Sequence, residues 1–160
     1  MGTSLVSALI NDAQTILVDA GATRWGSPEF LAWANAAQRD IATIAPESAG
    51  KSTNLQLVAG TRQVLPADNI SLLRVVRNMG ADGATPGEAP RQTSEAMLDQ
   101  QNPGWHIGAG TLVVKNYTYD PRMPNQFYVY PPMSGPTYVE INYVAVPALL
   151  VNTTDTISLD

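Results

Sequence analysis

The spacing of apolar residues changes once along this chain, near residue 51, and that change constrains the fold more than any other feature. Before it, apolar residues recur every three or four positions, as on one face of a helix. After it, they alternate in runs such as NLQLV (54–58) and RQVLP (62–66), as in half-buried strands. Helices followed by strands in 160 residues predict the α+β class and a single domain over residues 1–160.

Two helices are expected within residues 3–46. The apolar positions from Leu5 to Leu17 have helical spacing and form the first, which Gly21 ends. The second begins at SPE (27–29), where a hydroxyl suited to capping, a proline and an early carboxylate favour a helix start, and it ends at Pro46. The short connection GATRWG predicts that the two helices fold back as an antiparallel hairpin.

The remaining sequence predicts a mostly antiparallel β-sheet with one short inserted helix. A β-hairpin and a further strand are expected in residues 52–78, followed by a mobile, glycine-rich loop in residues 79–92. A short helix is expected in residues 93–101 and a three-strand β-meander in residues 111–147. Residues 148–160 form a tail whose last stretch, DTISLD, resembles the start of a further helix.

Composition excludes several classes of function. Without cysteine there are no disulfides, thiolate zinc sites or thiol nucleophiles. The net charge is −5 and the basic residues are scattered, so the chain lacks the basic stripe typical of nucleic-acid binding proteins. The N-terminal segment lacks the features of a signal peptide or membrane span, so we expect synthesis in a cytoplasm and no membrane contact.

The low charge suggests a surface made for packing. Charged residues are 14% of the chain, against about 25% in an average soluble domain. Much of the surface is therefore uncharged and suited to contact with neighbouring molecules.

No constellation of residues predicts catalysis. His106 in NPGWHIG is the single histidine, and alone it supplies neither a metal cluster nor a catalytic relay. Glu95 and Asp99 lie four apart on the expected short helix, but solvated carboxylates are the default there. The glycines of GADGATPG match neither a phosphate loop nor a dinucleotide fingerprint. We therefore expect no catalytic, cofactor or metal site, and no enzyme.

The segment YDPRMPNQFYVYPP (119–132) places aromatic rings among four prolines, which are expected to limit a short strand from Gln126 to Tyr130. Alternation assigns Phe127 and Val129 to the core, and Tyr128 and Tyr130 to the opposite face. The candidate residues for contact with a partner are Asp120, Arg122, Tyr128, Tyr130, Trp105, His106 and Arg91. The alternative hypothesis is a ligand-binding β-module in which Trp105, Tyr128 and Tyr130 form a stacking platform.

Four stretches carry a family resemblance that covers residues 4 to 150. They are LAWANAAQRDIATIAP, LQLVAGTRQVLPADNISLLRVVRNMG, SEAMLDQQNPGWH and YDPRMPNQFYVYPP. In this order they resemble the adaptor, or head-to-tail connector, proteins of tailed bacteriophages. Members of that family continue into further helices after the last strand, whereas this sequence stops at DTISLD.

The resemblance implies a structural virion protein located in the neck, between head and tail. Its copies would form a ring, expected to be a dodecamer, beneath the portal of the DNA-filled head and would offer a platform to a tail or neck protein. DNA would leave through the channel of this ring without specific binding, which suits the acidic balance of the chain. The loop 79–90 and the turns 120–126 and 131–136 are expected to carry partner contacts.

Overall fold

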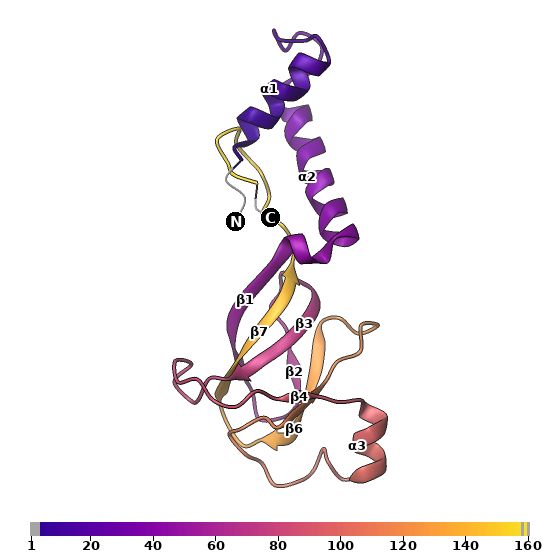
Figure 1. Cartoon of the computed structure of the whole chain (residues 1–160), viewed down its shortest axis with the longest axis vertical. Coiled ribbons are helices and arrows are strands. Elements are labelled where there is room, and N and C mark those ends of the chain that lie inside the picture. The colour runs from indigo at the N-terminus through magenta and orange to yellow at the C-terminus, as the bar shows by residue number, and fades with distance from the viewer. Residues whose placement is uncertain (1–3, 158, 160) are drawn as a thin grey trace. The chain divides into compact units, whose positions relative to one another are not determined.

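The computed structural model describes residues 4–157 and residue 159, and the chain divides into two compact units (Figure 1). The helical unit lies within Met1–Ala49 and Val146–Asp160, and the sheet unit is Gly50–Ala145. Each unit has an apolar cluster of its own. The α+β class is confirmed. A single domain over residues 1–160 stays a prediction.

The helical unit contains both predicted helices, α1 (Val6–Ile16) and α2 (Ser27–Ile44), followed by a 3-10 turn, η1 (Pro46–Ala49). At the start of α2, the Glu29 carboxylate accepts a hydrogen bond of 2.8 Å from the N–H of Gly26, the N-cap residue. Both helices supply buried side chains to the cluster Val6, Ile10, Phe30, Ala34 and Leu150. Their close packing as an antiparallel hairpin stays a prediction.

Residues 148–157 contain no helix, and the helix start expected at DTISLD lies partly outside the described residues and stays a prediction. This segment instead binds the start of α1, where the N–H groups of Val6 and Ser7 donate to the carbonyls of Asp155 (3.0 Å) and Thr153 (2.8 Å). The first N–H groups of a helix lack intrahelical partners. Since Leu5, the N-cap residue, offers no side-chain cap, the tail supplies these acceptors.

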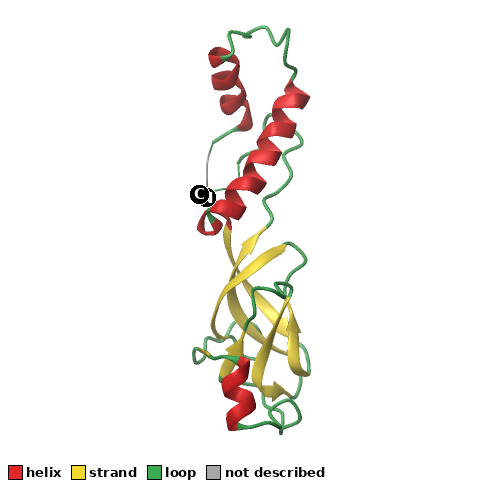
Figure 2. Ribbon diagram, turned by 90° about the vertical axis from the view of Figure 1, so that its right-hand side faces the viewer, coloured by secondary structure: helices red, strands yellow, loops and turns green. Residues whose placement is uncertain are grey.

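The sheet unit contains two sheets (Figure 2). The first is antiparallel and has the order β1 (Gly50–Leu57), β7 (Thr137–Ala145), β3 (Asn69–Asn78). The second has the order β2 (Gly60–Val64), β6 (Gln126–Met133), β5 (Asn116–Thr118), β4 (Arg91–Gln92). Its pairs are antiparallel except for β4 and β5, which run parallel.

Both sheets contribute to one apolar core. Its members include Leu57, Val75, Ile141 and Tyr143 from the first sheet, and Phe127, Val129 and Tyr117 from the second. Phe127 and Val129 are 1% and 0% exposed, so the predicted inward face of β6 is confirmed.

The predicted hairpin of residues 54–58 and 62–66 is wrong, because β1 pairs with β7 and β2 pairs with β6. The two strands thus enter different sheets. The buried side chain of Gln63 binds the backbone of the turn between them. Its Oε1 accepts from the Val58 N–H (2.8 Å), and its Nε2 donates to the carbonyls of Val58 (2.9 Å) and Gly60 (3.2 Å). A side chain here replaces the backbone pairing of a hairpin.

The predicted three-strand meander is also wrong in part. The antiparallel pairing of β5 with β6 is confirmed, but β7 leaves this sheet and lies between β1 and β3. The prolines do not end β6 at Tyr130, since the strand continues to Met133. A proline still offers its carbonyl, and that of Pro132 accepts a hydrogen bond of 2.8 Å from the Thr111 N–H.

The short inserted helix is confirmed as α3 (Glu95–Gln101), with Ser94 Oγ accepting from the Met97 N–H at 3.2 Å. The preceding residues 79–92 are irregular except for β4, and they are fastened at several points. The Gly80 carbonyl accepts from the Tyr138 N–H at 2.9 Å, and the Gly83 carbonyl accepts from Asn54 Nδ2 at 2.8 Å.

Candidate partner interface

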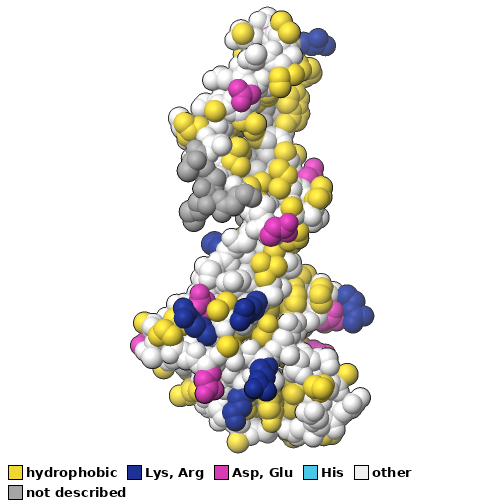
Figure 3. Space-filling view, in the orientation of Figure 1, with side chains coloured by type: hydrophobic (Ala, Val, Ile, Leu, Met, Phe, Trp, Pro, Cys, Tyr) yellow, Lys and Arg dark blue, Asp and Glu magenta, His cyan; other side chains and the backbone are white. Residues whose placement is uncertain are grey.

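An apolar groove of about 380 Å³ runs along the helical unit, a feature that the sequence patterns did not reveal. It is lined by Leu9, Ile10, Ala13, Ile16, Leu17, Phe30, Trp33, Ala34 and Ala37. Hydrophobic side chains are visible over both helices in Figure 3. Ile16 is 80% exposed and Trp33 is 47% exposed. Contiguous exposed apolar surface of this kind marks sites of interaction with other molecules.

Trp33 is held in place by other aromatic rings. It packs edge-on against Phe30, with ring centroids 5.4 Å apart, and against Trp25 at 5.3 Å. The Arg24 guanidinium lies 5.5 Å from the centre of the Trp25 ring. A large aromatic side chain that is fixed and half exposed loses little freedom on binding, and such residues are common interface anchors.

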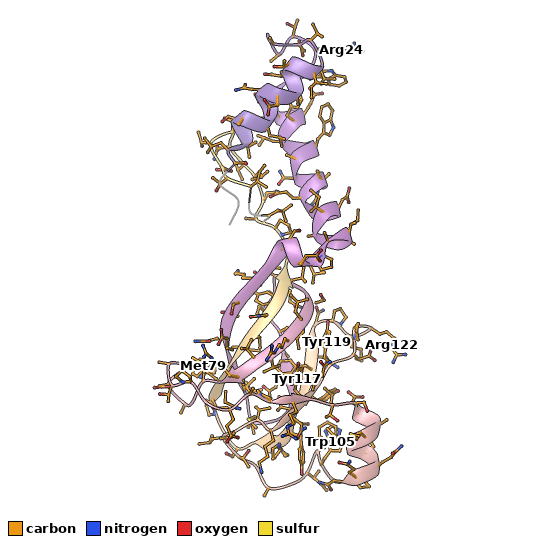
Figure 4. The ribbon with its side chains drawn as sticks, in the orientation of Figure 1. Arg24, Met79, Trp105, Tyr117, Tyr119 and Arg122 are labelled. Atoms are coloured by element: carbon orange, nitrogen blue, oxygen red, sulfur yellow. The ribbon has the colours of Figure 1, made fainter. Side chains whose placement is uncertain are left out.

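The structure brings Trp105, His106 and Tyr128 together in the sheet unit. The His106 ring stacks on Trp105 with centroids 3.7 Å apart, and Tyr128 meets both rings edge-on at 6.1 Å and 5.7 Å. Trp105 is 1% exposed, and its indole N–H donates to Asp99 at 2.9 Å (Figure 4). Because its faces are covered, Trp105 cannot stack on a ligand, and the predicted stacking platform loses its central ring.

His106 makes a structural contact within this cluster. Its Nδ1 lies 2.8 Å from the hydroxyl oxygen of Thr61 on β2. Over residues 4–157, no three His, Asp or Glu side chains are arranged to hold a metal ion. The cluster therefore ties β2 to the segment after α3.

Asp120 and Arg122 form an ion pair in the turn before β6. The Arg122 Nη2 lies 2.9 Å from Asp120 Oδ2, and its side chain is 89% exposed at the outer end of the turn (Figure 4). The hydrogen bond from Arg122 lowers the pKa of Asp120. This turn borders a groove of about 290 Å³, whose other wall includes Ser94 and Glu95 at the start of α3. These two candidate contact residues thus lie at the surface and bind each other.

Tyr130 and Arg91 lie apart from the other candidate residues. Tyr130 is partly buried on β6, and its carbonyl accepts from the Lys115 N–H at 2.9 Å. Arg91 is exposed on β4, and its N–H donates to the Lys115 carbonyl at 2.9 Å. The seven candidate residues therefore occupy several surfaces, and their role in partner contact stays a prediction.

The two units differ in net charge. This difference was not predicted from the sequence, because the basic residues are scattered along the chain. The helical unit contains two basic and seven acidic residues and carries the whole net charge of −5. The sheet unit contains seven of each and is neutral. Figure 3 shows several Lys and Arg side chains gathered on one face of the sheet unit. The two units therefore differ by five in net charge, with the negative charge on the helical unit.

None of the described helices combines the length and the apolar character needed to cross a membrane.

Comparison with known proteins supports the resemblance seen in the sequence. No curated protein matches the chain. A family model described as SU10 adaptor protein matches residues 4–160, which is nearly the whole chain. This family consists of structural adaptor proteins of bacteriophages and is not a known enzyme family. The chain therefore belongs to the SU10 adaptor protein family and is a phage head-to-tail adaptor.

Proposed function

We propose that this adaptor is a non-catalytic protein of the virion neck that joins the portal of the DNA-filled head to a tail or neck protein. Its copies form a ring, expected to be a dodecamer, on the portal. The observation that carries this proposal is the family match over residues 4–160. The work of such a protein is association, so its functional residues are those that form contacts.

The helical unit supports an assembled state. Its groove exposes Leu9, Ile16 and Trp33 to water in a single chain. Burial of apolar surface contributes roughly 25 cal/mol for each Å² removed from water. Covering this groove by another subunit would therefore favour assembly.

The charge of the chain supports passage of DNA through the ring without specific binding. The net charge of −5 repels phosphates over the molecule as a whole. A channel continued by this ring would then conduct DNA with little retention, because a duplex is held chiefly by neutralisation of its phosphates.

Mass measurement tests the proposal. The purified chain would be analysed by native mass spectrometry and sedimentation, alone and after mixing with portal rings of the same phage. We expect a closed oligomer in at least the second case, bound to the portal. A chain that stays monomeric in the presence of portal rings would contradict the proposal.

A further inference from the structure

We propose that neighbouring copies of the chain join through opposite charges, with the basic face of one sheet unit on the acidic helical unit of the next copy. The basic face consists of Arg74, Arg77, Arg91 and Lys115. This inference rests on the proposed ring and specifies which surfaces form its repeating contact.

The buried residue Asn78 joins the chain segments that carry the basic face. Asn78, at the end of β3, donates through Nδ2 to the carbonyls of Glu88 (2.7 Å) and Val114 (2.9 Å). Arg77 immediately precedes Asn78, and Lys115 immediately follows Val114. The backbone bond between Arg91 and Lys115 adds β4 to the same junction. Three neighbouring chain segments thus each carry an exposed cation, Arg77, Lys115 and Arg91.

Most of these cations have no partner in the part of the chain that the structure describes. Among the described residues, the side chains of Arg74, Arg91 and Lys115 form no hydrogen bond or ion pair, and all three are exposed. Arg77 binds Glu140 at 2.6 Å. Exposed cations on neighbouring segments, as Arg91 and Lys115 are, favour a partner that carries carboxylates.

The helical unit of a second copy offers such carboxylates, two of them beside its groove. Asp12, Asp40 and Glu47 are exposed, and none has a hydrogen bond or ion pair among the described residues. Asp12 lies three residues after Leu9 in α1, and Asp40 lies three after Ala37 in α2. Residues three apart are neighbours on a helix surface, so these carboxylates border the apolar groove.

Exposed apolar side chains lie next to the basic residues in the sequence, and they could pack into the apolar groove of the next copy. Leu112 and Val113 precede Lys115 and are 50% and 45% exposed. Leu73, beside Arg74, is 48% exposed. A contact with apolar side chains at its centre and opposite charges around them has the usual anatomy of a protein interface. Because it uses two different surfaces, it repeats from copy to copy and can close a ring.

Charge reversal in two sets of variants tests the contact. The first set is Arg74→Glu, Arg91→Glu and Lys115→Glu in one chain. The second is Asp12→Lys, Asp40→Lys and Glu47→Lys in another. The six positions are exposed and unpaired among the described residues, so both chains should keep the wild-type circular dichroism. Arg62→Glu, at an exposed residue of β2, is the matched single control for Arg91→Glu.

Each triple variant alone should associate at least tenfold more weakly than wild type, with or without portal rings. An equal mixture of the two should assemble to within about threefold of wild type. In an alternating ring, contacts between two reversed surfaces alternate with contacts between two wild-type surfaces, and both kinds join opposite charges. Arg91→Glu should weaken association more than Arg62→Glu. A mixture that stays monomeric would overturn the inference, and so would triple variants that assemble normally.

The outcome separates this inference from the proposed function. If wild type forms rings and the triple variants do so equally well, only the charge contact is wrong. If wild type itself stays monomeric with portal rings, both proposals are wrong. If the first triple variant assembles normally but loses retention of a fluorescent 30-base-pair duplex, the basic face binds nucleic acid and the inference is wrong.

Discussion

Asn78 and Val114, which are 36 residues apart, bind each other through both backbone groups of Val114. The Val114 N–H donates to Asn78 Oδ1 at 2.8 Å, and the Val114 carbonyl accepts from Asn78 Nδ2 at 2.9 Å. Both residues are buried. Asn78 ends a strand of the first sheet, and Val114 lies just before β5 of the second. The Asn78 side chain therefore links the two sheets. It donates one hydrogen bond and accepts another, as the backbone of a neighbouring strand does.

Replacing Asn78 with leucine should destabilise the sheet unit by about 3–4 kcal/mol. The substitution leaves the buried N–H and carbonyl of Val114 without partners, and each such group costs roughly 1–3 kcal/mol. Urea unfolding followed by circular dichroism measures the loss. The control is Asn54→Ala, which removes an exposed bond to the Gly83 carbonyl and should cost less than about 1 kcal/mol. Equal effects of the two substitutions would contradict the assigned role of Asn78.

Asp99→Ala should destabilise the chain by about 1–3 kcal/mol, because it leaves the buried indole N–H of Trp105 unsatisfied. Gln100→Ala, at an exposed neighbour on α3, should have little effect. Thermal unfolding monitored by tryptophan fluorescence compares the two variants. An Asp99→Ala protein as stable as wild type would show that the indole has another partner.

Trp33→Lys should weaken assembly by at least tenfold, since it places a charge within the apolar groove. Ala32→Lys adds the same charge at an exposed α2 position that does not line the groove, and it should leave assembly near wild type. Sedimentation velocity over a range of concentrations gives the comparison. If Trp33→Lys assembles as well as Ala32→Lys, the groove is not an interface.

Asp68 should make stability depend on pH in the acidic range. Burial alone raises the pKa of Asp68, but hydrogen bonds from Lys51 (3.0 Å) and Tyr143 (3.1 Å) outweigh it and hold that pKa below its ordinary value of 3.8. A carboxyl whose pKa is lowered by folding stabilises the protein above its unfolded pKa, and this contribution is lost as pH falls through the folded pKa.

Asp68→Asn should therefore lower the free energy of unfolding by no more than about 1 kcal/mol at pH 7, because the pair with Lys51 is largely exposed. At pH 3 the difference from wild type should be smaller. Urea titrations at the two pH values measure it. A difference that is unchanged or larger at pH 3 would reverse the assigned sign.

Arg122→Glu should impair assembly and leave folding intact. Its side chain is 89% exposed and its charged partner is Asp120, so the substitution affects only the exposed turn. Arg122→Gln removes the charge without reversing it and should have a smaller effect on assembly. Native mass spectrometry with portal rings provides the measurement. Normal assembly of Arg122→Glu would exclude this turn from the partner contact.

The sequence named candidate contact residues that stay predictions, and it missed two other surface features for identifiable reasons. Trp105, His106 and Tyr128 do meet, but their contact depends on packing of the segment after α3 against β6, which no local pattern predicts. The groove around Trp33 was missed, since helical spacing shows which residues share a face and not whether another element covers it. The charge polarity was missed because it depends on which residues belong to each unit.

Local patterns along the chain were enough to predict its family and several of its helices and strands. Helical spacing placed α1 and α2, a short helix was expected at residues 93–101, where α3 lies, and alternation correctly buried Phe127 and Val129. Only the tertiary structure decided which strands pair. Alternation assigns each side chain to a face but does not name a partner strand, so β1 joined β7, some 80 residues away, in place of the adjacent β2. The pairing depends on the shared core and on buried side chains such as Gln63 and Asn78, whose hydrogen bonds exist only once distant segments meet.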